Sequence, residues 1–135
     1  MPENPKVKVD VRRTGRRFDA VAVVELAADP RIVWDTITDY DALPRFMPGI
    51  RECRVIERHA PTKTTEQLRV EQHGDFRFLL FGVGMTVHLD IRHESRRVAH
   101  ARAERIELGS FPHDAIEVFE GRYELEALDA RKQAP

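Results

Sequence analysis

The second half of the chain alternates apolar and polar residues, and this period of two constrains the fold more than any other feature. It is clearest over residues 85–92 (MTVHLDIR), where every second side chain is apolar. A β-strand with one buried face has this pattern, because successive side chains point to opposite sides of a sheet. Similar patterns predict strands at residues 18–26, 50–58, 64–81, 97–108 and 115–128.

The connections between the later strands are short, so we expect these strands to pair as an antiparallel meander that twists and curls. Ala60 and Pro61 interrupt the pattern after one strand, and Gly82 and Gly84 flank a predicted turn. Gly74 lies inside the longest strand, where a glycine is typical of a bulge. The predicted architecture is a curved antiparallel sheet.

Two short helices are predicted between the first strand and the meander. Asp29 is a favourable N-cap, and Pro30 suits the first helical position because its missing N–H needs no partner there. An apolar stripe over residues 30–39 predicts a short amphipathic helix. Pro44 and Pro48 limit the next segment to a turn and one short helix around residues 42–46. The fold class is therefore α+β.

The length of 135 residues suits one domain, which we place at residues 16–128, with a flexible lead-in over 1–15 and a tail over 129–135. A formal net charge of −1 argues against a global attraction to nucleic acid or anionic lipid. The lone cysteine, Cys53, excludes an intramolecular disulfide and is expected to be structural. Because no apolar leader or membrane-length run is present, we expect a cytoplasmic protein, or a periplasmic one if a signal peptide was removed.

Residues 28–58 read ADPRIVWDTITDYDALPRFMPGIRECRVIER. This segment resembles the opening of the START-like (SRPBCC) superfamily, in its polyketide cyclase/dehydrase and coenzyme Q-binding branch. Residues 119–128 (FEGRYELEAL) are similar to a later strand of the same branch. The resemblance implies a helix-grip fold, in which a curved antiparallel sheet grips a long C-terminal helix around a hydrophobic cavity. It also implies a lipophilic ligand such as a lipid, quinone, polyketide or hormone.

The chain departs from the family near its end. The family continues with another strand and the long helix, whereas this sequence ends with LDARKQAP after residue 127. We therefore expect the C-terminal strand and helix to be missing, which leaves an apolar face and a sheet edge uncovered. A second copy of the chain is expected to cover them, through edge pairing or exchange of elements.

The residues expected to line the cavity lie on the short helices and on one parity of the strands. They are Trp34, Tyr40, Phe46, Met47, Leu68, Val70, Gln72, Phe76, Phe78, Met85, Val87, Leu89, Phe119 and Tyr123. The alternative for this set is an ordinary packed core. The small side chains of residues 99, 101 and 103 would leave space and favour a cavity.

Two polar side chains share the apolar parity, and both have two interpretations. Gln72 either orients a ligand carbonyl or hydroxyl, or bonds to the backbone or turns outward at a bulge. The Tyr123 hydroxyl lies either in the pocket or on its rim. No histidine spacing indicates a metal, so we expect no metal or other cofactor and solvent-facing histidines at positions 59, 73, 88, 93, 100 and 113.

The leading hypothesis is a module that binds a quinone, polyketide or acyl lipid. The first alternative is a polyketide aromatase/cyclase, with Gln72, Arg102 and Tyr123 as weak catalytic candidates, although no acid/base pair is visible. The second alternative is a ribosome- or membrane-associating protein that acts through the four arginines of residues 12–17. Nucleic acid is not an expected partner, and membrane contact would be transient.

Overall fold

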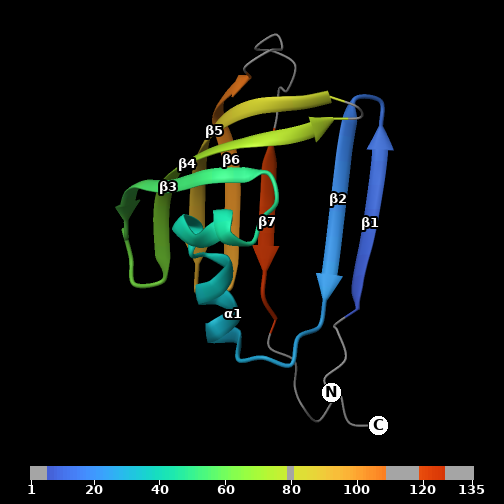
Figure 1. Cartoon of the computed structure of the whole chain (residues 1–135). Helices are drawn as coiled ribbons and strands as arrows, with labels where there is room; N and C mark the ends of the chain where they lie inside the picture. Colours follow the sequence, from blue (N-terminus) through green and yellow to red (C-terminus); the bar gives the residue numbers. More distant parts are fainter. Residues whose placement is uncertain (1–5, 79–80, 109–118, 127–135) are drawn as a thin grey trace.

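The computed structural model describes residues 6–78, 81–108 and 119–126. These residues form two antiparallel sheets and two short helices (Figure 1). The five-stranded sheet has the order β3-β4-β5-β6-β7, and the two-stranded sheet pairs β1 with β2. The elements are β1 (Val7–Thr14), β2 (Arg17–Val24), α1 (Pro30–Ile37), the 3-10 helix η1 (Tyr40–Arg45), β3 (Ile50–His59), β4 (Thr65–Phe78), β5 (Phe81–Glu94), β6 (Val98–Leu108) and β7 (Glu120–Glu124).

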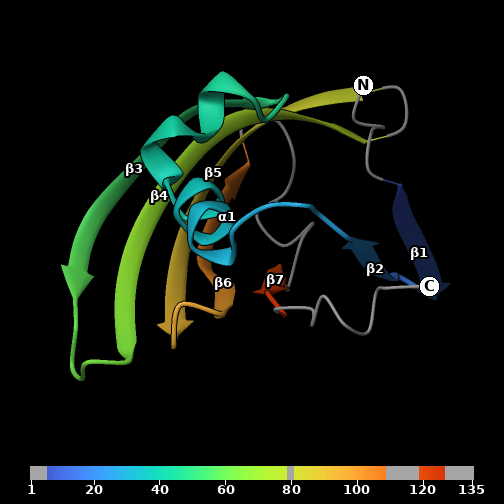
Figure 2. The same ribbon diagram turned by 90° about the horizontal axis from the view of Figure 1, so that it is seen from below.

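The five-stranded sheet is strongly curved, and α1 lies inside its curve (Figure 2). Because all neighbouring strands are consecutive in the chain, the predicted antiparallel meander is confirmed. The predicted α+β class is also confirmed, as a curved antiparallel sheet with two short helices ahead of it. The sheet is not closed into a barrel, so its concave face has an open side.

The two faces of the sheet follow the alternation of the sequence. The concave face holds the buried apolar core, in which Leu68, Val70 and Val87 are the largest fully buried side chains. The convex face holds the opposite parity, where Arg69 lies 3.7 Å from Glu57 and 3.9 Å from Asp90. The hydrophobic effect therefore orients the sheet, with its apolar parity under the helices and its charged parity in water.

The helices begin where the sequence predicts. The Asp29 side chain accepts a hydrogen bond of 2.9 Å from the backbone N–H of Arg31, and Pro30 is the first helical residue. Helix α1 ends at Ile37, slightly before the predicted end, and buries Trp34. The second helix is the 3-10 helix η1, which buries Tyr40.

The predicted bulge at Gly74 lies instead on the facing strand. Strand β3 carries extra residues at Arg51 and Ile56, whereas β4 pairs with β5 without interruption. Gly74 serves a different purpose, because a Cβ at this position would lie 2.2 Å from the backbone oxygen of Gly49. That oxygen accepts a 2.8 Å hydrogen bond from the N–H of Asp75. The position thus requires a residue without a side chain.

The predicted turn at Gly82 and Gly84 is also wrong. Both glycines lie within β5, which begins at Phe81, and β4 ends at Phe78 rather than at residue 81. Gly82 pairs with Arg77, and Gly84 pairs with Asp75. The backbone pairing of β4 and β5 thus continues past both glycines to Phe78 and Phe81.

Part of the predicted lead-in, Val7–Thr14, has regular secondary structure. These residues form β1, which pairs with β2 over all eight positions from Val7–Val24 to Thr14–Arg17. Two residues, Gly15 and Arg16, connect the strands, and Gly15 has the positive φ (+62°) that such tight hairpin turns need. The predicted first strand therefore belongs to a separate hairpin and not to the curved sheet.

Candidate functional site

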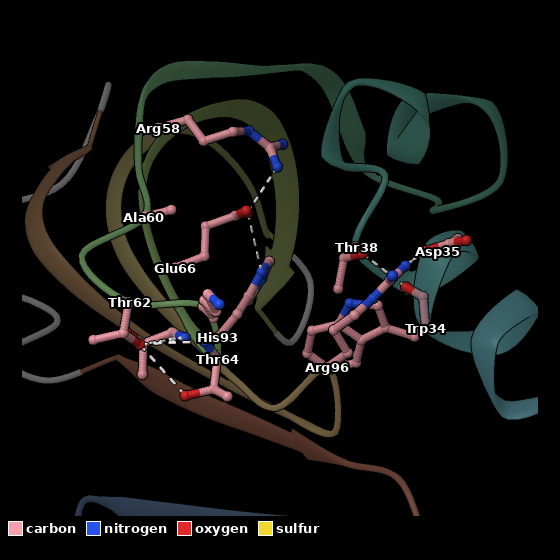
Figure 3. Close-up of a pocket in the computed structure, with 12 residues that line it drawn as sticks. Trp34, Asp35, Thr38, Arg58, Ala60, Thr62, Thr64, Glu66, His93 and Arg96 are labelled. Carbon is pink, nitrogen blue, oxygen red and sulfur yellow. Dashed lines mark hydrogen bonds and ion pairs between the residues drawn. The ribbon is translucent and has the colours of Figure 1, made fainter.

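A pocket of about 290 Å³ lies at one end of the concave face. Helix α1, the connection between β3 and β4, and the turn between β5 and β6 surround it (Figure 3). Its lining residues are Trp34, Asp35, Thr38, Arg58, Ala60, Thr62, Lys63, Thr64, Thr65, Glu66, His93 and Arg96. Most of these side chains are polar or charged, so the pocket differs from the apolar cavity that the sequence predicts.

The centre of this site is His93, which is only 6% exposed. Its Nε2 atom lies 2.7 Å from the Tyr40 hydroxyl, and its Nδ1 atom lies 3.5 Å from Oε1 of Glu66. The same carboxylate oxygen accepts a 2.7 Å hydrogen bond from Nη1 of Arg58. The indole of Trp34 meets the imidazole edge-on, with ring centroids 5.0 Å apart. Four polar side chains thus form one continuous chain beneath a tryptophan.

The neighbours of His93 set the direction of this chain. A carboxylate only accepts hydrogen bonds, so the imidazole nitrogen facing Glu66 carries the proton. In the neutral ring, the other nitrogen then has a free lone pair and accepts a hydrogen bond from the Tyr40 hydroxyl. The order of donation is therefore from Tyr40 to His93 and from His93 to Glu66.

The protonation states fit this order. Burial lowers the pKa of His93 from its ordinary value of 6.5, and the positive charge of Arg58 lowers it further, although Glu66 opposes both effects. Burial also raises the pKa of Tyr40 above its ordinary value of 10. At neutral pH the imidazole and the phenol are both uncharged, and the pair holds no net charge in the core.

Local chain geometry explains how these groups meet. Glu66 and His93 lie directly opposite each other in the β4–β5 register, on the parity that also supplies Leu68 and Ile91 to the core. Arg58 reaches the same face because the bulge at Ile56 shifts the parity of β3 by one residue. A strand with unbroken alternation from Cys53 would place Arg58 on the convex face.

The turn between β5 and β6 forms the outer wall of the pocket. Ser95 and Arg96 both have a φ of +53°, a region that non-glycine residues rarely adopt. Two contacts hold this turn: the Ser95 N–H donates to the Thr64 oxygen at 2.7 Å, and Nη2 of Arg96 lies 2.6 Å from Oδ1 of Asp35. The second contact ties the turn to α1 across the pocket (Figure 3).

Comparison with known protein families identifies a match over most of the chain. The model of the family described as polyketide cyclase/dehydrase and lipid transport matches residues 26–132. The chain belongs to this family. Comparisons with curated proteins and with solved structures gave no match. Membership of the polyketide cyclase/dehydrase and lipid transport family indicates a lipophilic ligand. It also confirms the predicted relation to polyketide cyclases/dehydrases. The coenzyme Q-binding branch stays a prediction.

Half of the residues predicted to bind the ligand are buried in the core. These are Trp34, Tyr40, Leu68, Val70, Met85, Val87 and Leu89. Of them, only Trp34 lines the pocket. The described part of the concave face is thus packed where the family resemblance implies a cavity, and whether its residues also contact a ligand stays a prediction.

The remaining predicted residues have different surroundings. Phe46, Met47, Phe119 and Tyr123 are exposed. The side chains of Phe76 and Phe78 lie outside the described residues.

The three weak catalytic candidates are not brought together. Gln72 lies on β4 opposite Cys53, whereas Tyr123 lies on β7 opposite Ala99, with two strands between β4 and β7 in the sheet. Arg102 lies on the convex parity opposite Asp90. Gln72 has a partner in the Cys53 thiol, to which it hydrogen-bonds, although burial still raises the pKa of that thiol to about 11. Cys53 is therefore protonated and unreactive at neutral pH.

The expectation of solvent-facing histidines is wrong for His93. It holds for His59 and His100, which are exposed. His73 is partly buried between Thr86 and Glu71 on the convex face, and His88 is also partly buried. His113 lies outside the described residues. The position of His93 could have been predicted, because it continues the odd parity of Met85 to Ile91.

No metal site accompanies these residues. Within residues 6–78, 81–108 and 119–126, no three histidine, cysteine, aspartate or glutamate side chains lie close enough to hold an ion. Among the helices that the structure describes, none is long and apolar enough to cross a membrane.

Proposed function

We propose that this protein binds a lipophilic small molecule whose polar group enters the pocket at His93. The observation that carries the proposal is the chain of buried Tyr40, buried His93 and partly buried Glu66 on a face whose core is apolar. Burying polar groups costs free energy unless each has a partner, so a fold gains nothing from such a chain by packing alone. The family supports a lipophilic ligand.

The pocket favours a ligand with acceptor oxygens. Its side chains include Arg58, Lys63 and Arg96, and a guanidinium carries five N–H donors, of which each salt bridge uses one or two. Lys63 has no carboxylate within 4.0 Å among the residues that the structure describes. Glu66 already accepts from its neighbours. A carbonyl of a quinone or polyketide, or the carboxylate of an acyl lipid, would satisfy the unused donors.

The test combines detection of a natural ligand with a panel of known probes. Native mass spectrometry of the purified protein should reveal a bound lipophilic molecule. Decylubiquinone, emodin and decanoic acid represent the three classes, and at least one should raise the melting temperature. The increase should disappear in Lys63→Glu, which changes an exposed lining residue, and persist in Arg54→Glu on the convex face. Empty protein whose melting temperature responds to none of the three probes would contradict the proposal.

A second function, polyketide aromatase/cyclase activity, is favoured by the direction of the hydrogen-bond chain. A neutral histidine between a phenol and a carboxylate can pass protons, as enolisation and dehydration of a poly-β-keto chain require. Because Tyr40 occupies Nε2 of His93, the substrate would have to displace the tyrosine or use Glu66 directly. Conversion of a poly-β-keto thioester by the wild-type protein and not by Glu66→Gln would support catalysis. A bound but unchanged thioester would leave ligand binding as the function.

A further inference from the structure

The hairpin formed by β1 and β2 lies outside the segment that matches the family, and one of its faces is exposed and apolar except for Arg13. In the register, Val7 faces Val24, Val9 faces Ala22 and Val11 faces Ala20, with Phe18 next along the same face. Val9 is 62% exposed and Phe18 is 68% exposed. Two strands alone do not bury such a face, so it is available to a partner.

The same hairpin is the most basic part of the chain. Residues 6–19 contain six lysines and arginines and two aspartates, a formal charge of +4. Since the whole chain carries −1, the other residues together carry −5. The positive charge is therefore concentrated on the element that also exposes the valines.

Two arginines at the hairpin turn are not engaged by carboxylates. Arg12 pairs with Asp10 at 3.3 Å and Arg17 pairs with Asp19 at 3.0 Å, whereas Arg13 and Arg16 have no carboxylate within 4.0 Å in the described part of the chain. Arg13 instead lies above the Phe18 ring, 5.3 Å from its centroid. A cation and an aromatic ring thus share one exposed end of the hairpin.

We propose that this hairpin docks on an anionic membrane surface. The valines and Phe18 would enter the boundary between headgroups and acyl chains, and Arg13 and Arg16 would contact lipid phosphates. The arrangement of an apolar face with a basic end suits such an interface, where both hydrophobic and charged groups find partners. This inference does not depend on which ligand the pocket at His93 takes.

The hairpin fits other partners less well. Proteins that bind single-stranded nucleic acid stack successive bases on several aromatic rings, and this face has only Phe18 among valines and alanines. A second copy would gain little from the face, because two eight-residue strands span about 27 Å by 10 Å. That area is roughly a third of the 800 Å² that each partner buries in a stable dimer.

The location of the hairpin is consistent with membrane docking. It lies beside the five-stranded sheet, across from β3 and on the side toward which the concave face opens (Figure 2). A membrane bound there would lie near the open side of the sheet. A lipophilic molecule could then pass between the bilayer and the concave face without crossing much water.

The test is co-sedimentation of the full chain with lipid vesicles. We expect binding to vesicles of phosphatidylcholine mixed with phosphatidylserine, little binding to phosphatidylcholine alone, and release by salt. The double variant Arg13→Glu/Arg16→Glu should weaken partitioning by at least about tenfold. Phe18→Ser should also weaken it, because it removes apolar contact without a change of charge. Arg54→Glu/Arg102→Glu on the convex face is the control matched in charge and should bind like the wild type.

Several results would overturn the inference. Equal binding to neutral vesicles, or equal loss of binding in both double variants, would show that the hairpin is not the anionic docking surface. Salt-sensitive binding to RNA in place of vesicles would assign the arginines to nucleic acid. A dimer in light scattering that Phe18→Ser dissociates, without any vesicle binding, would assign the apolar face to a second copy. Because the variants change the hairpin and the convex face and leave the pocket at His93 intact, their failure leaves the proposed ligand site unaffected.

Discussion

The curved sheet and the hairpin have the same sequence pattern and opposite surroundings. Both are antiparallel and alternate in polarity, yet the apolar parity of the sheet is buried and that of the hairpin is exposed. Leu68 in β4 is 2% exposed, whereas Val9 in β1 is 62% exposed. Alternation therefore shows which side chains share a face, but a second element must be present to cover that face. Helices α1 and η1 cover the sheet, and no described element covers the hairpin.

The two regions are expected to differ most in how much stability they lose when an apolar side chain is truncated. Leu68→Ala should lower the free energy of unfolding by about 2–5 kcal/mol, because it leaves a cavity in the core. Val9→Ala should change it by less than about 0.5 kcal/mol, because the side chain is in water. Urea denaturation of both variants measures the comparison. Equal losses would show that the hairpin face is covered in solution.

A smaller effect is expected from the backbone contact between β4 and the start of β3. Gly74→Ala would place a Cβ within 2.2 Å of the Gly49 oxygen, and the backbone would have to move at a cost of roughly 1–3 kcal/mol. Gly121→Ala in β7 is the matched control, because no atom lies within 4 Å of its Cβ position. Thermal unfolding should separate the two variants. A Gly74→Ala protein as stable as the wild type would refute the close approach of these two segments.

The polar chain on the concave face has no counterpart on the hairpin. Tyr40→Phe would leave the lone pair of His93 Nε2 buried without a donor, which should lower stability by about 1–3 kcal/mol. Tyr123→Phe is the control, because that hydroxyl is on an exposed residue and its loss should cost little. Chemical denaturation at neutral pH measures both. A neutral effect of Tyr40→Phe would indicate that the hydrogen bond is absent in solution.

The smallest expected effect is a pH dependence from His93. Burial lowers its pKa, so the unfolded chain binds a proton below about pH 6.5 that the folded protein does not. The free energy of unfolding therefore has its full value above that pH. It falls as the pH decreases toward the lowered pKa of His93, by at most about 1.4 kcal/mol per pH unit. His93→Gln should reduce this slope, and His100→Gln at an exposed position should keep it. Identical slopes in all three proteins would contradict a buried neutral histidine.

Much of this fold could be predicted from local pattern. The meander follows from alternation, and the start of α1 follows from Asp29 and Pro30. Glu66 and His93 could also have been placed on the concave face, since they continue the apolar parities of β4 and β5. The position of a residue in an alternating strand therefore predicts its face of the sheet even when the residue is polar and its neighbours on that face are apolar.

Other features depend on tertiary geometry that no local pattern contains. Arg58 reaches the pocket only because β3 has a bulge at Ile56, and nothing in the sequence around that residue marks it. Tyr40 and His93 are 53 positions apart, so their hydrogen bond follows from how η1 packs on the sheet. The separation of the hairpin from the curved sheet also depends on packing, because its strand pattern resembles that of the sheet.

The central claim is that a lipophilic ligand places its polar group beside His93. Trp34 is the single tryptophan of the chain and lines this pocket, so its indole N–H gives one assignable NMR signal. We propose to titrate decylubiquinone, emodin and decanoic acid in turn while following that signal and the imidazole signals. We expect that a bound probe shifts the signals of Trp34 and His93 together and leaves those of His59 and His100 unchanged. Saturable binding that leaves Trp34 and His93 unshifted would contradict it.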